Sequence, residues 1–136
     1  MEKIFKRLLL AALALYVTSF FLPWFTWKHY TQDQAQAISW YGAGGLETHL
    51  QIVFSYSFLV IFIVAYVGLF FFQRWARTLY FSAIVLSYVY SLFAGVVVSI
   101  PIESIFWGAY ATLEGALIAI LLFTSIATHF NHPHNK

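Results

Sequence analysis

Four apolar stretches, each about as long as a helix that crosses a bilayer, occupy most of the 136 residues. They lie at residues 4–22, 50–72, 79–99 and 105–128, and roughly 20 predominantly apolar residues suffice to cross the hydrocarbon core. Backbone polar groups in lipid must be satisfied internally, which a helix does within its own segment. The pattern predicts an all-α integral membrane protein, a four-transmembrane-helix antiparallel bundle that forms a single domain over residues 1–136.

The composition excludes several classes of protein. Hydrophobic residues make up 62% of the chain and charged residues 9%, whereas about one quarter of a soluble domain is charged. The chain has no cysteine, which excludes disulfides, thiolate nucleophiles and thiolate metal sites. The net charge of +2 is small and its basic residues form no stripe, so we expect the lipid bilayer as the surroundings and no nucleic-acid partner.

The basic residues also predict the orientation. Basic residues are concentrated in loops on the cytoplasmic side of membrane proteins. With four spans, only Lys28 falls on one side of the membrane, and the other side receives Lys3, Lys6, Arg7, Arg74, Arg77 and Lys136. We therefore expect a multi-pass protein of the bacterial inner membrane with both termini cytoplasmic and one long extracytoplasmic loop at residues 23–49.

That outer loop carries four candidate site residues, Trp24, Trp40, Glu47 and His49. The layout resembles claudin-type tetraspans, which share a long first outer loop with tryptophans, a basic inner turn and a short second outer loop. The paired loop cysteines of that family are absent here. The resemblance therefore implies a membrane topology and carries over no functional residue.

Glu114 is the most unusual residue, because it lies near the centre of the fourth apolar stretch. An ionised carboxylate is costly there, so the group must be protonated, hydrogen-bonded or exposed to a water-filled cavity. On a helical wheel it shares a stripe with Trp107 and Tyr110, which together form a candidate intramembrane polar site. One interpretation is a proton or cation site, or a polar contact for a partner. The other is a neutral acid bonded to a neighbouring span, with candidate partners Ser55, Tyr56, Ser57, Ser87, Tyr88 and Ser91.

A second stripe of the same span consists of small residues. Gly108, Thr112, Gly115 and Ala119 recur at helical spacing, about a third of a turn from the first stripe. Small residues let membrane helices approach closely. The stripe predicts a helix-packing face or a face for a partner protein.

Tyrosine is more abundant in the apolar stretches than interfacial belts require. Several of these side chains should point into the bundle, where their hydroxyls pair with one another or with Glu114. They could line a lipid or quinone cleft, although aromatic packing is the simpler interpretation. The residues concerned are Tyr16, Tyr56, Tyr66, Tyr80, Tyr88, Tyr90 and Tyr110.

The chain lacks the motifs of metal sites and enzymes. Histidines and carboxylates on the outer side could converge as zinc or manganese ligands, but the spacing of His29, Asp33, Glu47, His49 and Glu103 matches no established signature. There is also no His-Glu-x-x-His, Gly-x-Ser-x-Gly or phosphate-binding loop. We expect no metal, no cofactor and no enzymatic activity.

The leading hypothesis is a small non-enzymatic protein that acts by protein–protein binding in the bilayer. It would be an accessory subunit of a membrane complex or an immunity-type protein against a pore-forming toxin, with a membrane-protein partner or a second copy bound through the small stripe and the loop around Trp40. One alternative is a small transporter or channel with Glu114 as the proton- or cation-coupling group. The other is lipid or quinone binding between the aromatic-rich helices.

Overall fold

The computed structural model describes residues 2–34, 48–93, 99–124, 126 and 130. The long helices are α1 (Glu2–Thr26), α3 (Thr48–Phe70), α4 (Arg74–Ser91) and α5 (Pro101–Phe123), and a short 3-10 turn, η1 (Trp27–His29), follows α1. The described residues contain no strand. α1, α3 and α5 are long and apolar enough to cross a membrane, so the expected all-helical class of apolar, span-length helices is confirmed for these three.

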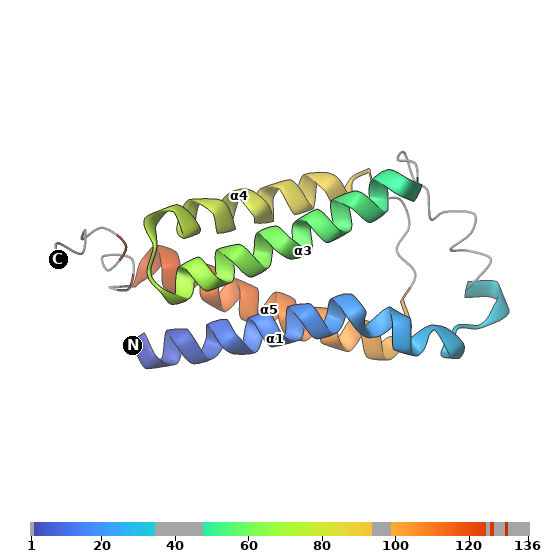
Figure 1. Ribbon diagram of the computed structural model, residues 1–136. Coiled ribbons are helices and arrows are strands. Elements are labelled where there is room, and N and C mark those ends of the chain that lie inside the picture. Colours follow the sequence, from blue (N-terminus) through green and yellow to red (C-terminus); the bar gives the residue numbers. More distant parts are fainter. Residues whose placement is uncertain (1, 35–47, 94–98, 125, 127–129, 131–136) are drawn as a thin grey trace.

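Consecutive helices run in opposite directions, as Figure 1 shows. α1 packs along α5, α3 packs along α4, and contacts between α1 and α3 join the two pairs. The start of α1, the turn from α3 to α4 and the end of α5 lie at one end of the molecule. The first helix of the chain is therefore paired with the last.

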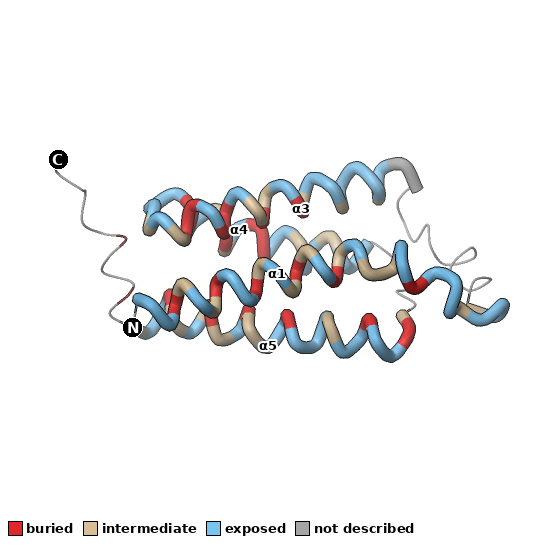
Figure 2. The backbone as a smooth tube through the Cα atoms, turned by 60° about the horizontal axis from the view of Figure 1, so that its bottom comes forward, coloured by how far each residue is buried: buried red, intermediate tan, exposed pale blue. Residues whose placement is uncertain are grey.

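The buried faces follow helical spacing. The buried residues of α1 lie three or four positions apart over most of its length, which places them on one stripe toward α5 and α3. The outer faces of the helices are exposed along their length (Figure 2), and many large apolar side chains lie on them. An apolar exterior of this kind suits a lipid environment. The buried stripe of α1 comprises Phe5, Leu9, Ala12, Tyr16 and Ser19.

The turn between α3 and α4 is tighter than the sequence suggested. The expected spans 50–72 and 79–99 leave residues 73–78 between them, but α4 already begins at Arg74. Gly68 permits this close approach, because a Cβ at that position would lie 2.5 Å from the Cβ of Ala76. The Gln73 N–H donates to the Gly68 carbonyl at 2.9 Å, and Phe72 adopts the left-handed conformation with φ 53°. α4 therefore starts earlier than the expected span, and Gly68 lets α3 and α4 pack closely right up to the turn.

The other helix ends also differ from the expected spans. α1 continues past Pro23 to Thr26, because proline removes only one helical hydrogen bond and is tolerated in membrane helices. α5 begins at Pro101 rather than at residue 105 and ends at Phe123 rather than at 128. Proline suits the first helical position, and the Glu103 carboxylate accepts the Ile100 N–H at 3.3 Å. The expected third span, 79–99, includes residues 94–98, which lie outside the described residues.

Candidate functional site

Glu114 lies in the interior of the structure, with 9% of its surface exposed. The Tyr110 hydroxyl, one turn earlier on α5, donates to its Oε1 at 2.7 Å. One interpretation of the sequence expected a bond from Glu114 to the second or third apolar stretch. The bond that the structure shows lies within α5 instead. Ser57 and Ser87, two of the expected partners, donate instead to carbonyls of their own helices.

Each long helix contributes one buried tyrosine to the region around Glu114. Tyr16 of α1 and Tyr110 of α5 have ring centroids 5.2 Å apart, and Tyr66 of α3 and Tyr80 of α4 have centroids 5.6 Å apart. Phe62 bridges the two pairs, at 5.1 Å from Tyr16 and 6.2 Å from Tyr80. We call these four tyrosines the tyrosine core, and its linked rings connect all the long helices.

Two hydroxyls of the tyrosine core are unpaired. The hydroxyls of Tyr66 and Tyr80 are buried and have no hydrogen-bond partner among the described residues. The Tyr66 hydroxyl lies near the hydroxyls of Tyr80 and Tyr110, but it meets hydrogen-bond geometry with neither. A buried unpaired hydroxyl costs about 1–3 kcal/mol. Of the hydroxyls in the tyrosine core, that of Tyr110 donates to Glu114, and those of Tyr66 and Tyr80 remain able to donate a hydrogen bond.

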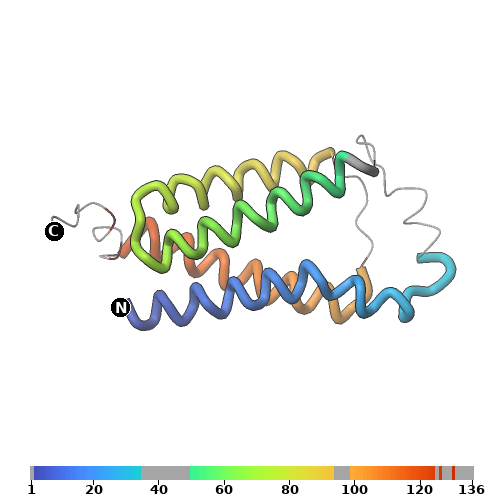
Figure 3. Tube along the Cα trace, in the orientation of Figure 1, coloured from blue at the N-terminus to red at the C-terminus, as the bar shows by residue number. Residues whose placement is uncertain are grey.

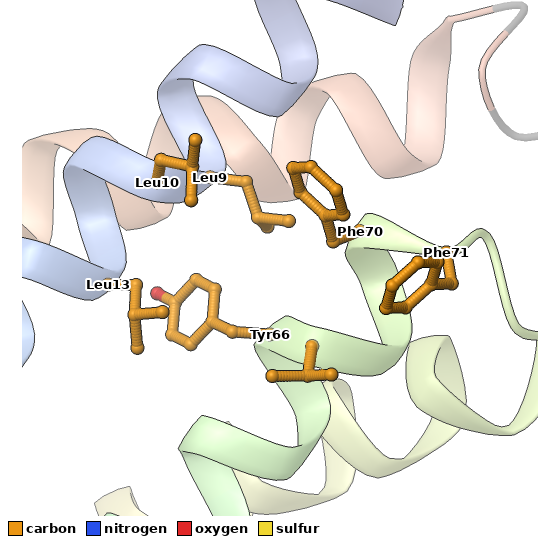
Figure 4. Close-up of a pocket in the computed structure, with 7 residues that line it drawn as sticks. Leu9, Leu10, Leu13, Tyr66, Phe70 and Phe71 are labelled. Atoms are coloured by element: carbon orange, nitrogen blue, oxygen red, sulfur yellow. The ribbon is translucent and has the colours of Figure 1, made fainter.

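A small crevice between α1 and α3 borders the tyrosine core. It has a volume of about 200 Å³ and is lined by Leu9, Leu10 and Leu13 of α1 and by Tyr66 and its neighbours on α3. Figure 4 shows the Tyr66 hydroxyl oxygen beside Leu13. Pockets for cofactor-sized ligands span roughly 300–1,000 Å³, so this crevice is too small for a quinone. A larger apolar groove of about 430 Å³ lies between α3 and α4.

Trp107, the third residue of the expected polar site, lies at the edge of the tyrosine core. Its ring is 6.3 Å from the Tyr16 ring and 5.9 Å from the Tyr110 ring, and 40% of its surface is exposed. The structure therefore places Trp107, Tyr110 and Glu114 side by side along α5, with Trp107 covering the two tyrosines from outside.

The small stripe of α5 faces away from the rest of the structure. Gly108, Thr112, Gly115 and Ala119 are all exposed, and a Cβ built on either glycine would meet nothing within 4 Å. The Thr112 hydroxyl donates to the Gly108 carbonyl of its own helix at 2.9 Å. Among the described helices, none occupies this face.

The expected outer-loop residues are only partly described. Trp24 belongs to the last turn of α1 and is exposed. Trp40 and Glu47 lie outside the described residues, as does the side chain of His49. The predicted site around Trp40, Glu47 and His49 therefore lies outside the part of the chain that the structure describes.

Glu103 belongs to a polar cluster that the sequence did not reveal. Its carboxylate, 2% exposed, accepts hydrogen bonds from the Thr26 hydroxyl and from the Tyr30 hydroxyl at 2.6 Å. We call Glu103, Thr26 and Tyr30 the outer latch, because they tie the end of α1 to the start of α5 on the side that the sequence predicts to be extracytoplasmic. Burial raises the pKa of the Tyr30 phenol to about 12, and the hydrogen bond to Glu103 adds to this shift.

The sequence raised the possibility that histidines and carboxylates converge as metal ligands on the outer side, and the outer latch involves one of these carboxylates, Glu103. Glu103 turns inward to Thr26 and Tyr30, whereas His29 and Asp33 are exposed. Within the described part of the chain, no three such residues come together. The helical signal that could have revealed the outer latch is Pro101 followed by Glu103, an acid in the first turn.

Comparison of the chain with protein-family models, with curated proteins and with solved structures finds no match.

Proposed function

We propose that the protein spans the membrane four times with both termini in the cytoplasm, and that α4 belongs to the remaining span. The alternating helix directions and the distribution of basic residues support this topology. The turn between α3 and α4 is short, so it fits at the surface of the membrane. Arg74 and Arg77 lie at that turn, where basic residues favour the cytoplasmic side.

Topology is tested by labelling single cysteines, because the native chain has none. Lys28 and Gln73 are both exposed and lie at opposite ends of the helices. A membrane-impermeant maleimide is expected to label Lys28→Cys in intact cells and Gln73→Cys only after permeabilisation. The reverse result would contradict the proposed orientation.

Within this topology, the function supported best is non-enzymatic binding of another membrane protein through the small stripe of α5. The observation that carries it is the open space over Gly108 and Gly115. Helices associate in lipid through close backbone packing at small residues, because the hydrophobic effect supplies no drive there. A transmembrane helix of a partner fits this face, as expected for an accessory subunit or an immunity-type protein that blocks a toxin within the bilayer.

The test fills the small stripe without disturbing the fold. Gly115→Leu places a bulky side chain on the stripe, and Ala109→Leu is the matched control, because Ala109 is also exposed and lies about a third of a turn from Gly115 around the helix. We expect a membrane protein that co-purifies in mild detergent from native membranes to be lost with Gly115→Leu and retained with Ala109→Leu. Equal recovery with both variants would refute the proposal, and a disulfide dimer of Gly115→Cys would identify a second copy as the partner.

A second candidate function is proton or cation transport through Glu114. The observation in its favour is the pair of unpaired hydroxyls on Tyr66 and Tyr80 near a buried carboxyl group, because such hydroxyls can bind water beside a protonatable group. Wild-type protein in proteoliposomes is then expected to carry a pH-dependent flux that Glu114→Gln abolishes. Flux no greater than in empty vesicles excludes this function.

A further candidate function is lipid or quinone binding, and the apolar groove between α3 and α4 supports it. Its volume of about 430 Å³ lies within the range of ligand pockets. Native mass spectrometry of protein purified from native membranes is expected to show a bound quinone or lipid that is lost when Ser57, on the wall of the groove, is changed to Phe. An unliganded mass for wild type counts against it.

A further inference from the structure

A second groove lies at the end of the molecule where α4 begins and α5 ends. It has a volume of about 720 Å³ and is lined by Arg74, Arg77, Thr78, Phe81, Ser82 and residues from the other end of the chain. Figure 3 shows the α3–α4 turn beside the end of α5. Segments far apart in the sequence therefore form this groove together.

Helical spacing explains why the polar groups of this groove converge. Arg74, Thr78 and Ser82 follow one another at intervals of four, and Arg77 and Phe81 form the adjacent row. Two guanidinium groups and two hydroxyl groups therefore lie along one wall. All four can donate hydrogen bonds, and a guanidinium can grip two oxygens of a phosphate at once.

The groove is held in shape on its other side by Phe130. The Arg74 Nε donates to the Phe130 carbonyl at 2.8 Å, and the Phe130 ring packs on Phe72 with centroids 5.4 Å apart. Leu122 of α5 adds an exposed apolar wall. The groove thus combines a basic polar wall with an apolar one.

The surrounding charge is also complementary to an anion. Arg77 forms no ion pair or hydrogen bond with any other described residue. The acid described at this end of the helices is Glu2, which pairs with Lys6 at 2.8 Å. No described carboxylate lines the groove to repel a phosphate.

We infer that this groove binds the phosphate headgroup of an anionic phospholipid. Arg77 and the hydroxyls of Thr78 and Ser82 donate to the phosphate oxygens, and the acyl chains follow Phe81 and Leu122 toward the hydrocarbon. Basic pockets between membrane helices on the cytoplasmic side bind such headgroups. The inference goes beyond the proposed partner binding, since it involves neither the small stripe nor a partner protein.

The experiment measures lipid retention by native mass spectrometry in mild detergent, with phosphatidylglycerol, phosphatidylcholine or inorganic phosphate added separately. Wild type is expected to retain phosphatidylglycerol over phosphatidylcholine, and Arg77→Gln to lose that preference on the order of tenfold, as for a charge-assisted hydrogen bond. Arg7→Gln is the matched control, because Arg7 is an exposed arginine on α1 that does not line the groove.

Ser82→Phe provides a second variant that fills the groove without removing a charge, so the test stands even where Arg77→Gln does not fold. Equal retention of phosphatidylglycerol by wild type and both groove variants overturns the inference. Displacement of the lipid by millimolar inorganic phosphate also overturns it, because the ligand is then free phosphate. Loss of the lipid with Arg77→Gln, and no loss with Gly115→Leu, separates this site from the partner face.

Discussion

The outer latch offers the sharpest test of the fold, because a single buried carboxylate joins α1 to α5. Replacing Glu103 by Ala removes the acceptor for Thr26, for Tyr30 and for the Ile100 N–H at once. We expect this change to destabilise the protein strongly, and to do so by loosening the outer end of the α1–α5 pair.

The magnitude follows from what each donor can do without Glu103. The Thr26 hydroxyl also reaches the Leu22 carbonyl at 3.1 Å, so it loses little. Tyr30 is partly exposed and can turn to water, whereas the Ile100 N–H loses its acceptor in a buried position. Hydrogen bonds to charged groups contribute about 1.5–3 kcal/mol each. We therefore expect about 3 kcal/mol for Glu103→Ala and about 1–2 kcal/mol for Tyr30→Phe, with coupling between the two changes of at least about 0.5 kcal/mol.

The assay is equilibrium unfolding in mixed micelles, followed by tryptophan fluorescence as the fraction of dodecyl sulfate is raised. Glu2→Gln is the control, since Glu2 forms an exposed ion pair with Lys6 four residues along the same helix, and such pairs contribute about 0.2–0.5 kcal/mol. A loss for Glu103→Ala no larger than for Glu2→Gln, or strictly additive effects with Tyr30→Phe, would refute the reasoning.

Three further predictions concern other parts of the structure. The Tyr30 phenol should ionise near pH 12 rather than at its usual value of 10.0, so the outer latch keeps its full strength below pH 10 and loses it as the pH rises through 12; phenolate absorbance compared with Tyr30→Phe measures this. Gly68→Ala should cost about 1–3 kcal/mol by overpacking against Ala76, and an unchanged unfolding midpoint would contradict the tight turn. Tyr66→Phe should leave stability unchanged or raise it by about 1 kcal/mol, because it removes an unpaired hydroxyl; a clear loss would reveal a hidden partner.

The sequence predicted those features that depend on local pattern. Apolar length identified α1, α3 and α5 as span-length helices, and helical periodicity placed Tyr110 and Glu114 next to one another. Both follow from spacing along a single helix, which sequence contains directly. The helix ends were less predictable, because Pro23 and Pro101 act in opposite ways within two otherwise similar apolar segments.

Features that depend on which helices meet could not be predicted. The outer latch joins residues more than 70 positions apart, and nothing near Glu103 in the sequence indicates Thr26 as its partner. The tyrosine core likewise draws one residue from each long helix. The excess of tyrosines was visible in the sequence, but the choice of Tyr66 and Tyr80 over the exposed Tyr56 and Tyr88 is made by helix packing.

The pairing of α1 with α5 has a consequence for biogenesis. Ribosomes add about 5–20 residues per second, so roughly 4 to 15 s separate the synthesis of Thr26 from that of Pro101. During this interval α1 lacks α5, the helix on which it packs most extensively. The side chains of Ser19 and Thr26, which are buried in the folded protein, are not yet covered. A nascent chain that stalls before its last helix is thus left with the Ser19 and Thr26 hydroxyls on an uncovered face of α1, which membrane quality control can recognise.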